Sequence, residues 1–170
     1  MSAFFELGQP EKVTVGTVGP AGQRIFFIQA REGATLVTLK VEKQQVGALA
    51  AHLGELLQDL ARPGELVSEE SLELETFEEP DFTVGSIALA YDAAIDRVVI
   101  LAEERVREGE GEGDADEARL ALTREQAGAL ATRGTRLVEA GRPPCPLCGF
   151  PLDPRGHACP RTNGHHAPLT

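Results

Sequence analysis

The stretch Val13-Thr-Val-Gly-Thr-Val18 returns later in the chain as Phe82-Thr-Val-Gly-Ser-Ile87. Two further blocks return in the same order, Arg24-Ile-Phe-Phe-Ile28 as Arg97-Val-Val-Ile-Leu101 and Gln45-Val-Gly-Ala-Leu-Ala50 as Gln126-Ala-Gly-Ala-Leu-Ala131. Alanine-rich segments resemble one another by chance, but β-branched strands and a helix that recur together in one order favour an internal duplication. The sequence therefore predicts two tandem units with the same succession of elements.

The first unit, at about residues 3–62, is predicted to contain four short strands followed by one helix. β-Branched and aromatic residues are concentrated at residues 4–7, 13–18, 24–30 and 35–41. Turns that contain Gly or Pro lie between all four of these runs, and short connections favour an antiparallel meander. Both faces of the third strand are apolar, which indicates a central position in the sheet. The helix is expected at residues 42–61, where leucines recur at helical spacing until Pro63 and Gly64.

The second unit, at about residues 71–141, repeats this succession. An edge strand is expected at 72–77, and further strands are expected at 82–91, 97–106 and 118–122. Thr123 and Gln126 have the spacing of a capping box, which begins the second helix. The strand at 82–91 carries the small residues Gly85, Ala88 and Ala90. Small residues on a strand face predict that a helix packs closely there.

The last 29 residues hold all three cysteines and three of the four histidines. Zn²⁺ prefers four thiolate or imidazole ligands in a tetrahedron, and Cys145-x-x-Cys148-Gly is the spacing of one half of such a site. A zinc ribbon would carry a second Cys-x-x-Cys, but Thr162 follows Cys159 at that position. The predicted ligands are therefore Cys145, Cys148, Cys159 and a histidine, for which His165 is favoured and His157 is the alternative. A site with four protein ligands is closed and structural.

These elements predict an α+β fold with a body at residues 1–141 and a zinc-binding tail at residues 142–170. The body would consist of two tandem repeats of an antiparallel β-meander plus a helix, and the tail would be a small zinc knuckle. Such a body is similar to the arrangement in the Whirly and PC4-like single-strand-binding proteins.

The composition argues against a membrane-spanning or a secreted protein. The chain has 170 residues, of which 42% are hydrophobic, and no segment has the apolar length that spans a bilayer. The N-terminal residues have neither the basic region nor the apolar region of a signal peptide, and the cysteines are clustered rather than spread as in a disulfide framework. These features predict a cytoplasmic protein without a membrane partner.

The charge is concentrated in the body. The whole chain carries a formal charge of −11, and the tail holds three arginines and one aspartate, so residues 1–141 carry −13. A body this acidic repels phosphate backbones and anionic membranes. With one tyrosine and no tryptophan, the chain also has few residues on which bases could stack. Nucleic acid is therefore a disfavoured partner.

Candidates for catalysis are few, and no catalytic residue is assigned. His52 is the one histidine of the body and is expected to be a partly exposed helix residue. Asp92 and Asp96 flank a predicted hairpin turn, where turn-forming carboxylates explain them better than an acid and base pair. The sequence therefore leans away from an enzyme.

The tail motif, which runs from Cys145-Pro-Leu-Cys148-Gly through His157-Ala-Cys159-Pro-Arg to Asn163-Gly-His165, resembles an actinobacterial family. That family is known as domain of unknown function 3090, and the resemblance covers the whole chain. It implies a cytoplasmic protein of a high-GC actinobacterium, which agrees with thirteen arginines against three lysines. It supplies no activity and no functional residue.

The function favoured by these observations is a non-catalytic binding or adaptor module with a structural zinc clip and an unknown protein partner. A first alternative is an enzyme or binder that acts on a small phosphorylated metabolite in a cleft between the repeats, lined by Arg24, Arg97 or His52. A second alternative is binding of single-stranded nucleic acid.

Overall fold

The computed structural model describes residues 2–20, 22–61, 64–65, 67–106, 109, 114–140 and 147. In chain order the described elements are β1 (Phe4–Leu7), β2 (Lys12–Val18), β3 (Ile25–Glu32), β4 (Thr35–Val41), α1 (Lys43–Gln58), η1 (Glu69–Leu72), β5 (Phe82–Asp92), β6 (Arg97–Glu104), β7 (Glu117–Leu122) and α2 (Arg124–Ala140). These bounds confirm the predicted strands and helices to within a few residues, except that η1 was not predicted and that no strand forms at residues 72–77. Neither described helix combines the length and apolar composition that crossing a membrane requires.

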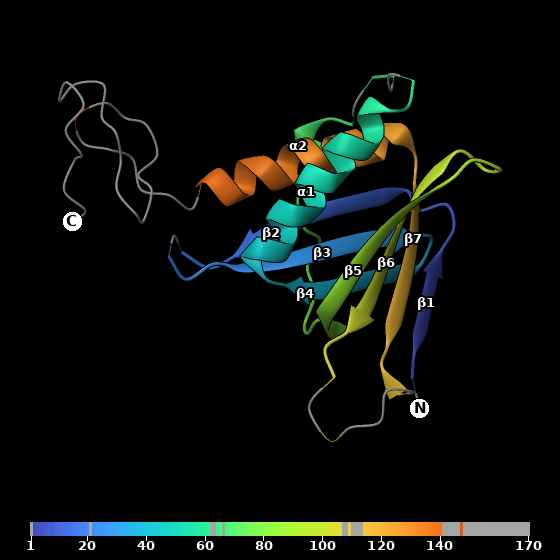
Figure 1. Ribbon diagram of the computed structural model, residues 1–170. Coiled ribbons are helices and arrows are strands. Elements are labelled where there is room, and N and C mark those ends of the chain that lie inside the picture. Colours follow the sequence, from blue (N-terminus) through green and yellow to red (C-terminus); the bar gives the residue numbers. More distant parts are fainter. Residues whose placement is uncertain are drawn as a thin grey trace.

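The seven described strands form one mixed sheet in the order β1-β7-β6-β5-β4-β3-β2. Strands β2, β3 and β4 are antiparallel to one another, as are β5, β6 and β7. Each of these groups of three is followed by a helix, and the α+β class is confirmed. The two groups cross at a steep angle, so the sheet is strongly bent (Figure 1).

The sheet contains two parallel pairings in addition to the antiparallel ones, and one of them removes β1 from the four-stranded meander predicted for the first unit. Strand β5 runs parallel to β4, and Phe82 at the beginning of β5 lies opposite Leu39 near the end of β4. The crossover connection that a parallel pair requires is formed by α1 and the segment after it. Strand β1 leaves the first unit altogether and pairs in parallel with β7, with Phe4 opposite Glu117 and Leu7 opposite Leu120.

Both helices pack on one side of the bent sheet and against each other (Figure 1). Small residues allow this close approach, since a Cβ on Gly134 would lie 3.3 Å from the Cβ of Ala50. The leucines and valines of α1 enter the same core as those of the strands, which is one continuous cluster that includes Val46, Leu53 and Leu130. The side-chain oxygen of Gln126 accepts a hydrogen bond from the backbone of Thr123, and the Thr123 hydroxyl accepts one from the backbone of Gln126, so the predicted capping box is confirmed.

The opposite face of β2, β3 and β4 is covered by residues 68–81, here called the strap. Leu72 is buried, and the rings of Phe77 and Phe27 meet edge to face with their centroids 4.8 Å apart. The prediction of an edge strand at 72–77 is wrong, because this segment crosses the face of the sheet instead of pairing along its edge. Both faces of β3 are thereby buried, as its apolar sequence predicted.

A row of buried polar side chains holds the strap in place. Thr14, Gln29 and Thr38 lie opposite one another on β2, β3 and β4. The amide of Gln29 accepts a hydrogen bond from the backbone N–H of Glu75 at 2.7 Å and donates one to the Glu75 carbonyl at 3.1 Å. Thr14 donates its hydroxyl to the carbonyl of Leu72. The strap therefore receives from side chains the hydrogen bonds that a strand would receive from a neighbouring backbone.

The two alanines of β5 do not face a helix. Ala88 and Ala90 are exposed, whereas Ile87 and Leu89 face the helices and are half-buried. The cause is a β-bulge between Val84 and Ser86, which adds one residue and reverses the alternation of inward and outward side chains.

We expect Gln29→Leu to lower the free energy of unfolding by about 1–3 kcal/mol, because the substitution leaves the half-buried N–H and carbonyl of Glu75 without these partners. Urea unfolding measures the loss, and hydrogen exchange should accelerate at the Glu75 amide. Gln58→Leu, at an exposed position on α1, is the matched control. If both variants unfold at the same urea concentration, the strap is not held by Gln29.

Candidate functional site

The predicted zinc ligands Cys145, Cys148, Cys159 and His165, with the alternative His157, lie outside the described residues. Within the described ranges, no group of three or more His, Cys, Asp or Glu side chains is placed to hold a metal ion. The body must therefore be considered for features other than a metal centre.

A groove of about 710 Å³ lies between α1 and β5, at the junction of the first and second units. We call it the seam groove. Its floor is apolar and is formed by Ala48, Leu49, Leu56, Ile87 and Leu89. Its rim is polar and is formed by Gln45, His52, Glu55, Asp59 and Ser86. Of the three side chains that the first alternative function would require in a cleft, namely Arg24, Arg97 or His52, this groove contains His52.

Helical and strand periodicity explain why these residues share one groove. Gln45, Leu49, His52, Leu56 and Asp59 are three or four residues apart, so they form one stripe along α1. Ile87 and Leu89 are two residues apart and point to the same face of β5. The two apolar stripes face each other across the groove. The groove is open to solvent along the side where the exposed residues His52 and Glu55 lie.

Gln45 fixes one end of the seam groove. Its side-chain oxygen accepts a hydrogen bond from the Glu42 backbone at 2.8 Å, and its Nε2 donates to the carbonyl of Val84 at 3.2 Å. The beginning of α1 is thus tied to the bulge of β5. Gly85 is required in this bulge, because a Cβ there would lie 2.8 Å from the Cα of Arg105.

The seam groove is electronegative. The carboxylates of Glu55 and Asp59 form neither a hydrogen bond nor an ion pair with any part of the chain that the structure describes, and no described Lys or Arg lines the groove. The last turn of α1 also contains no basic residue. Its free carbonyl groups therefore add the partial negative charge of a helix C-terminus.

The two arginines expected beside His52 lie elsewhere. Arg24 lines a separate pocket at the beginning of β3. Arg97 lies at the β5–β6 hairpin and donates a hydrogen bond to the carbonyl of Asp96 at 3.2 Å. Although Arg24 and Arg97 occupy corresponding positions in the recurring blocks, the fold does not bring them together.

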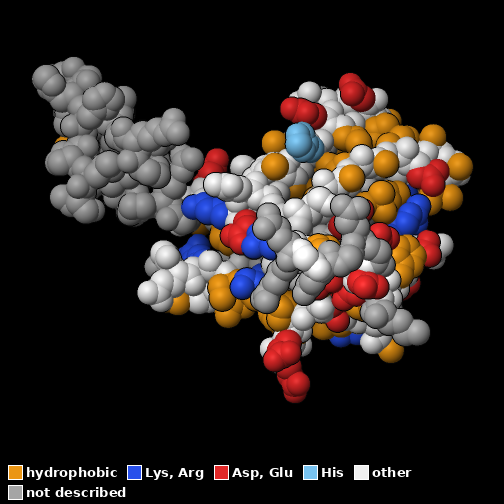
Figure 2. Space-filling view, turned by 60° about the horizontal axis from the view of Figure 1, so that its bottom comes forward, with side chains coloured by type: hydrophobic (Ala, Val, Ile, Leu, Met, Phe, Trp, Pro, Cys, Tyr) orange, Lys and Arg blue, Asp and Glu red, His pale blue; other side chains and the backbone are white. Residues whose placement is uncertain are grey.

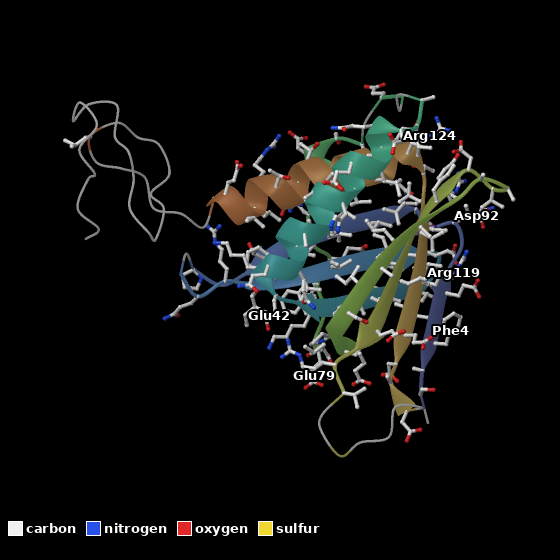
Figure 3. The ribbon with its side chains drawn as sticks, viewed as in Figure 1. Phe4, Glu42, Glu79, Asp92, Arg119 and Arg124 are labelled. Carbon is white, nitrogen blue, oxygen red and sulfur yellow. The ribbon has the colours of Figure 1, made fainter. Side chains whose placement is uncertain are left out.

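A polar cluster joins the β5–β6 hairpin to the beginning of α2. The Tyr91 hydroxyl donates to Asp96 at 2.6 Å, and the Arg124 guanidinium donates to the same carboxylate oxygen at 3.0 Å. Figure 3 shows Arg124 close to the hairpin that carries Asp92. Asp92 accepts a hydrogen bond from the backbone of Ala94, and Asp96 has a φ of 51°, so both are turn residues as predicted. The sequence did not indicate that Tyr91 and Arg124 belong to this cluster, because they are 33 residues apart in the chain.

We expect the contribution of this cluster to stability to disappear in acid. The Tyr91 hydrogen bond, together with Arg124, holds the pKa of Asp96 below its usual value, so the folded state favours the charged carboxylate. The stabilisation is present above the unfolded pKa of about 3.9 and is lost as the pH falls through the lower folded pKa. The melting temperature of Asp96→Asn should therefore lie below that of the wild type at neutral pH, and the difference should shrink in acid. Asp114→Asn is the control, and a difference that is undiminished at low pH would contradict the assignment.

Comparison with known proteins places the chain in a family. Neither the comparison with curated proteins nor the comparison with solved structures found a match. The family model described as "Protein of unknown function (DUF3090)" matches residues 5–159, which include the described body from residue 5 onward and most of the tail motif. The resemblance seen in the sequence is thereby confirmed, and the chain belongs to the DUF3090 family.

Proposed function

We propose that this protein is a non-catalytic binding module whose seam groove takes up a segment of a partner protein. The observation that carries the proposal is the pairing of an apolar floor with the unpaired carboxylates of Glu55 and Asp59. A segment that fits has an apolar face and carries Lys or Arg where it meets these carboxylates. Apolar contact would supply the affinity, and the carboxylates would select the orientation and the sign of charge.

The dimensions of the groove favour a helical segment. Its α1 side extends from Gln45 to Asp59, which corresponds to about 21 Å at 1.5 Å per residue. An amphipathic helix of about four turns matches this length and would place apolar residues at helical spacing over the floor. The groove also lies where two units of the chain meet, a common place for binding sites.

We further propose that residues 142–170 form a structural zinc clip in a cytoplasmic protein. The ligands would be Cys145, Cys148, Cys159 and His165, with His157 as the alternative fourth ligand. The support is the ligand chemistry and the spacing, since three cysteines close to histidines match the preference of Zn²⁺. The tandem duplication belongs to the same proposal and is supported by the succession of three antiparallel strands and a helix, which occurs twice in the described body.

The groove can be tested with a fluorescein-labelled, 14-residue synthetic peptide of leucine and lysine that forms an amphipathic helix. Fluorescence anisotropy with the full chain should show saturable binding at physiological ionic strength. Glu55→Lys should weaken binding about tenfold, because it replaces an attractive contact with a repulsive one. Leu89→Asn should also weaken binding, because it makes the floor polar.

A matched control is required because an acidic chain attracts any cationic peptide. Glu139→Lys changes the net charge by the same amount at an exposed position on α2. It should alter peptide affinity by less than about twofold. Equal weakening by both charge reversals, or no saturable binding, would exclude the seam groove as the docking surface.

If the tail is a zinc clip, the tail and the body should fold independently of each other. Removal of Zn²⁺ by a chelator, or Cys148→Ser, should disorder residues 143–166 and leave the body folded, because the described core lies within residues 1–141. Metal analysis should give one Zn²⁺ per chain, and circular dichroism should show an unchanged melting transition of the body. Collapse of the whole protein on chelation would contradict the division into body and tail.

A further inference from the structure

Arg124, the first residue of α2, joins the two walls of the seam groove although it does not line the groove. Each nitrogen of its guanidinium group donates to a different acceptor. Nε donates to Asp96 at 3.0 Å, Nη1 to the carbonyl of Ala61 at 3.1 Å, and Nη2 to the hydroxyl of Tyr91 at 3.3 Å. Ala61 follows the end of α1, and Tyr91 lies near the end of β5. One side chain therefore connects α1 with β5.

The two residues connected in this way lie directly beyond one end of the seam groove. Asp59 and Leu89 are the last residues of the α1 side and of β5 that line the groove. Ala61 and Tyr91 each lie two residues further along the chain. Since side chains two residues apart on a strand point to the same face, Tyr91 continues the row to which Leu89 belongs, and it packs against the hydrophobic core. We call this end, beside Asp59, the far end.

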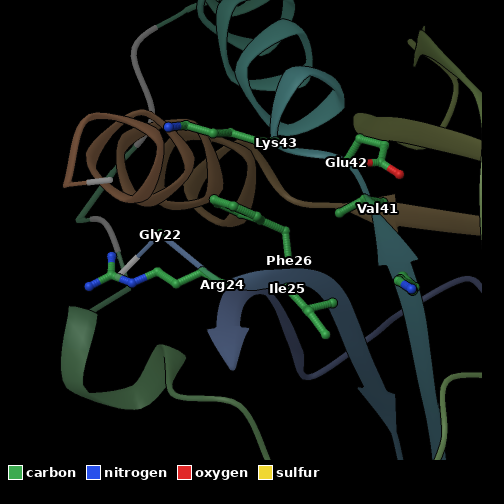
Figure 4. Close-up of a pocket in the computed structure, with 8 residues that line it drawn as sticks. Gly22, Arg24, Ile25, Phe26, Val41, Glu42 and Lys43 are labelled. Carbon is green, nitrogen blue, oxygen red and sulfur yellow. The ribbon is translucent and has the colours of Figure 1, made fainter. Parts of the chain in front are cut away.

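The near end of the groove is held by different residues. Gln45 donates a hydrogen bond to the carbonyl of Val84 at 3.2 Å, and the carboxylate of Glu42 lies 3.5 Å from the guanidinium of Arg105. Figure 4 shows Glu42 at the beginning of α1, with its carboxylate pointing away from Lys43. Both ends of α1 are therefore connected to β5 or to the residue that follows β6.

The lengths of the two walls agree with connections at both ends. The α1 side of the groove, from Gln45 to Asp59, is about 21 Å long at 1.5 Å per residue. The segment of β5 from Gly85 to Tyr91 is about 20 Å long at about 3.3 Å per residue. The helix and the strand thus lie side by side over the whole groove, and the connections at its ends hold them at a defined separation.

A defined separation is what distinguishes the groove from other apolar surface of the body. Phe4, Ile95 and Leu101 are exposed elsewhere, and Figure 2 shows hydrophobic side chains on several parts of the face that it displays. Between two walls that are held apart at a fixed distance, a side chain that is too large forces its neighbours to move. The width of the groove can therefore select a partner by the size of its apolar side chains.

We propose that Arg124 is a positioning residue that sets the width of the seam groove at its far end and thereby selects partner segments by the size of their apolar side chains. This inference rests on the proposed docking function. Loss of the connection releases the end of α1 from β5, so that the far end widens and larger side chains fit. The effect is on selectivity, because Arg124 itself does not line the groove.

Arg124→Lys tests the connection, because it keeps the positive charge but replaces three separate donor nitrogens with one. Hydrogen exchange of the full chain should accelerate about fivefold at the amides of Asp59 and Leu60, because the end of α1 loses a hydrogen bond that holds it. Tyr91→Phe removes only the contact with β5 and should act in the same direction, so the test does not depend on a single variant.

Selectivity is measured by fluorescence anisotropy of the full chain with two peptides. One is the leucine and lysine peptide described above, and in the other its first and last leucines are replaced by tryptophan. Whichever way the second peptide lies, one tryptophan then meets the far end. Arg124→Lys should shift the ratio of the two Kd values by about threefold in favour of the tryptophan peptide, and Tyr91→Phe should shift it in the same direction.

Arg119→Lys is the matched control, because Arg119 lies on β7 and pairs with Glu6 instead of with a residue near the groove (Figure 3). It should change neither the exchange rates nor the ratio of Kd values by more than about twofold. Unchanged exchange in Arg124→Lys overturns the connection.

Faster exchange with an unchanged ratio of Kd values overturns the selection by size. Equal weakening of both peptides does the same, because a purely structural role of Arg124 would act on both alike. If the wild type binds neither peptide, the docking function fails and the selection fails with it. In that case, faster exchange in Arg124→Lys still supports the connection between α1 and β5, so the two failures are distinguishable.

Discussion

The hydrogen bonds between Gln29 and the backbone of Glu75 are the constraint on which the arrangement of the two units depends. A buried amide in the middle of a strand is costly unless both of its polar atoms are satisfied. The strap satisfies them and is thereby held across the outer face of β2, β3 and β4. Because the strap is the connection between α1 and β5, its path determines where β5 begins. The parallel pairing of β4 with β5, and with it the seam groove, follows from that path.

Much of the fold could be predicted from the sequence because local patterns determine it. Alternation and β-branching located the strands, and leucine spacing together with the capping box at Thr123 located the helices. The strap was mistaken for a strand because Leu72 and Leu74 alternate with glutamates as they would in an edge strand. Its hydrogen bonds go to side chains of β2 and β3, and such partners have no local signature. The inward face of β5 was missed because the bulge beside Gly85 depends on the backbone of Arg105, twenty residues later.

The functional features were harder to predict from the sequence than the fold. His52 could be singled out as the one histidine of the body, but the apolar floor beside it required knowledge that β5 lies along α1. The charge count was also uninformative about individual side chains, since a body of −13 suggests a uniformly acidic surface. Which cations remain unpaired depends on tertiary contacts such as those of Arg31 with Glu75 and Arg124 with Asp96. A charge count includes every cation equally, whereas the folded structure shows which cations form ion pairs.

The parallel pairing of β1 with β7 has a consequence for how the chain is made. The backbone N–H of Ala3 donates a hydrogen bond to the side chain of Asp116, which lies 113 residues later in the chain. Phe4 lies opposite Glu117 in the sheet. During synthesis the first strand emerges from the ribosome long before its partner exists, and contacts of such high sequence separation form late. Strands β2 to β4 can assemble earlier from neighbouring hairpins. Strand β1 can therefore join the sheet only after β7 has been synthesised. Any segment fused ahead of β1 would lie beside β7, which is the last strand in the sequence.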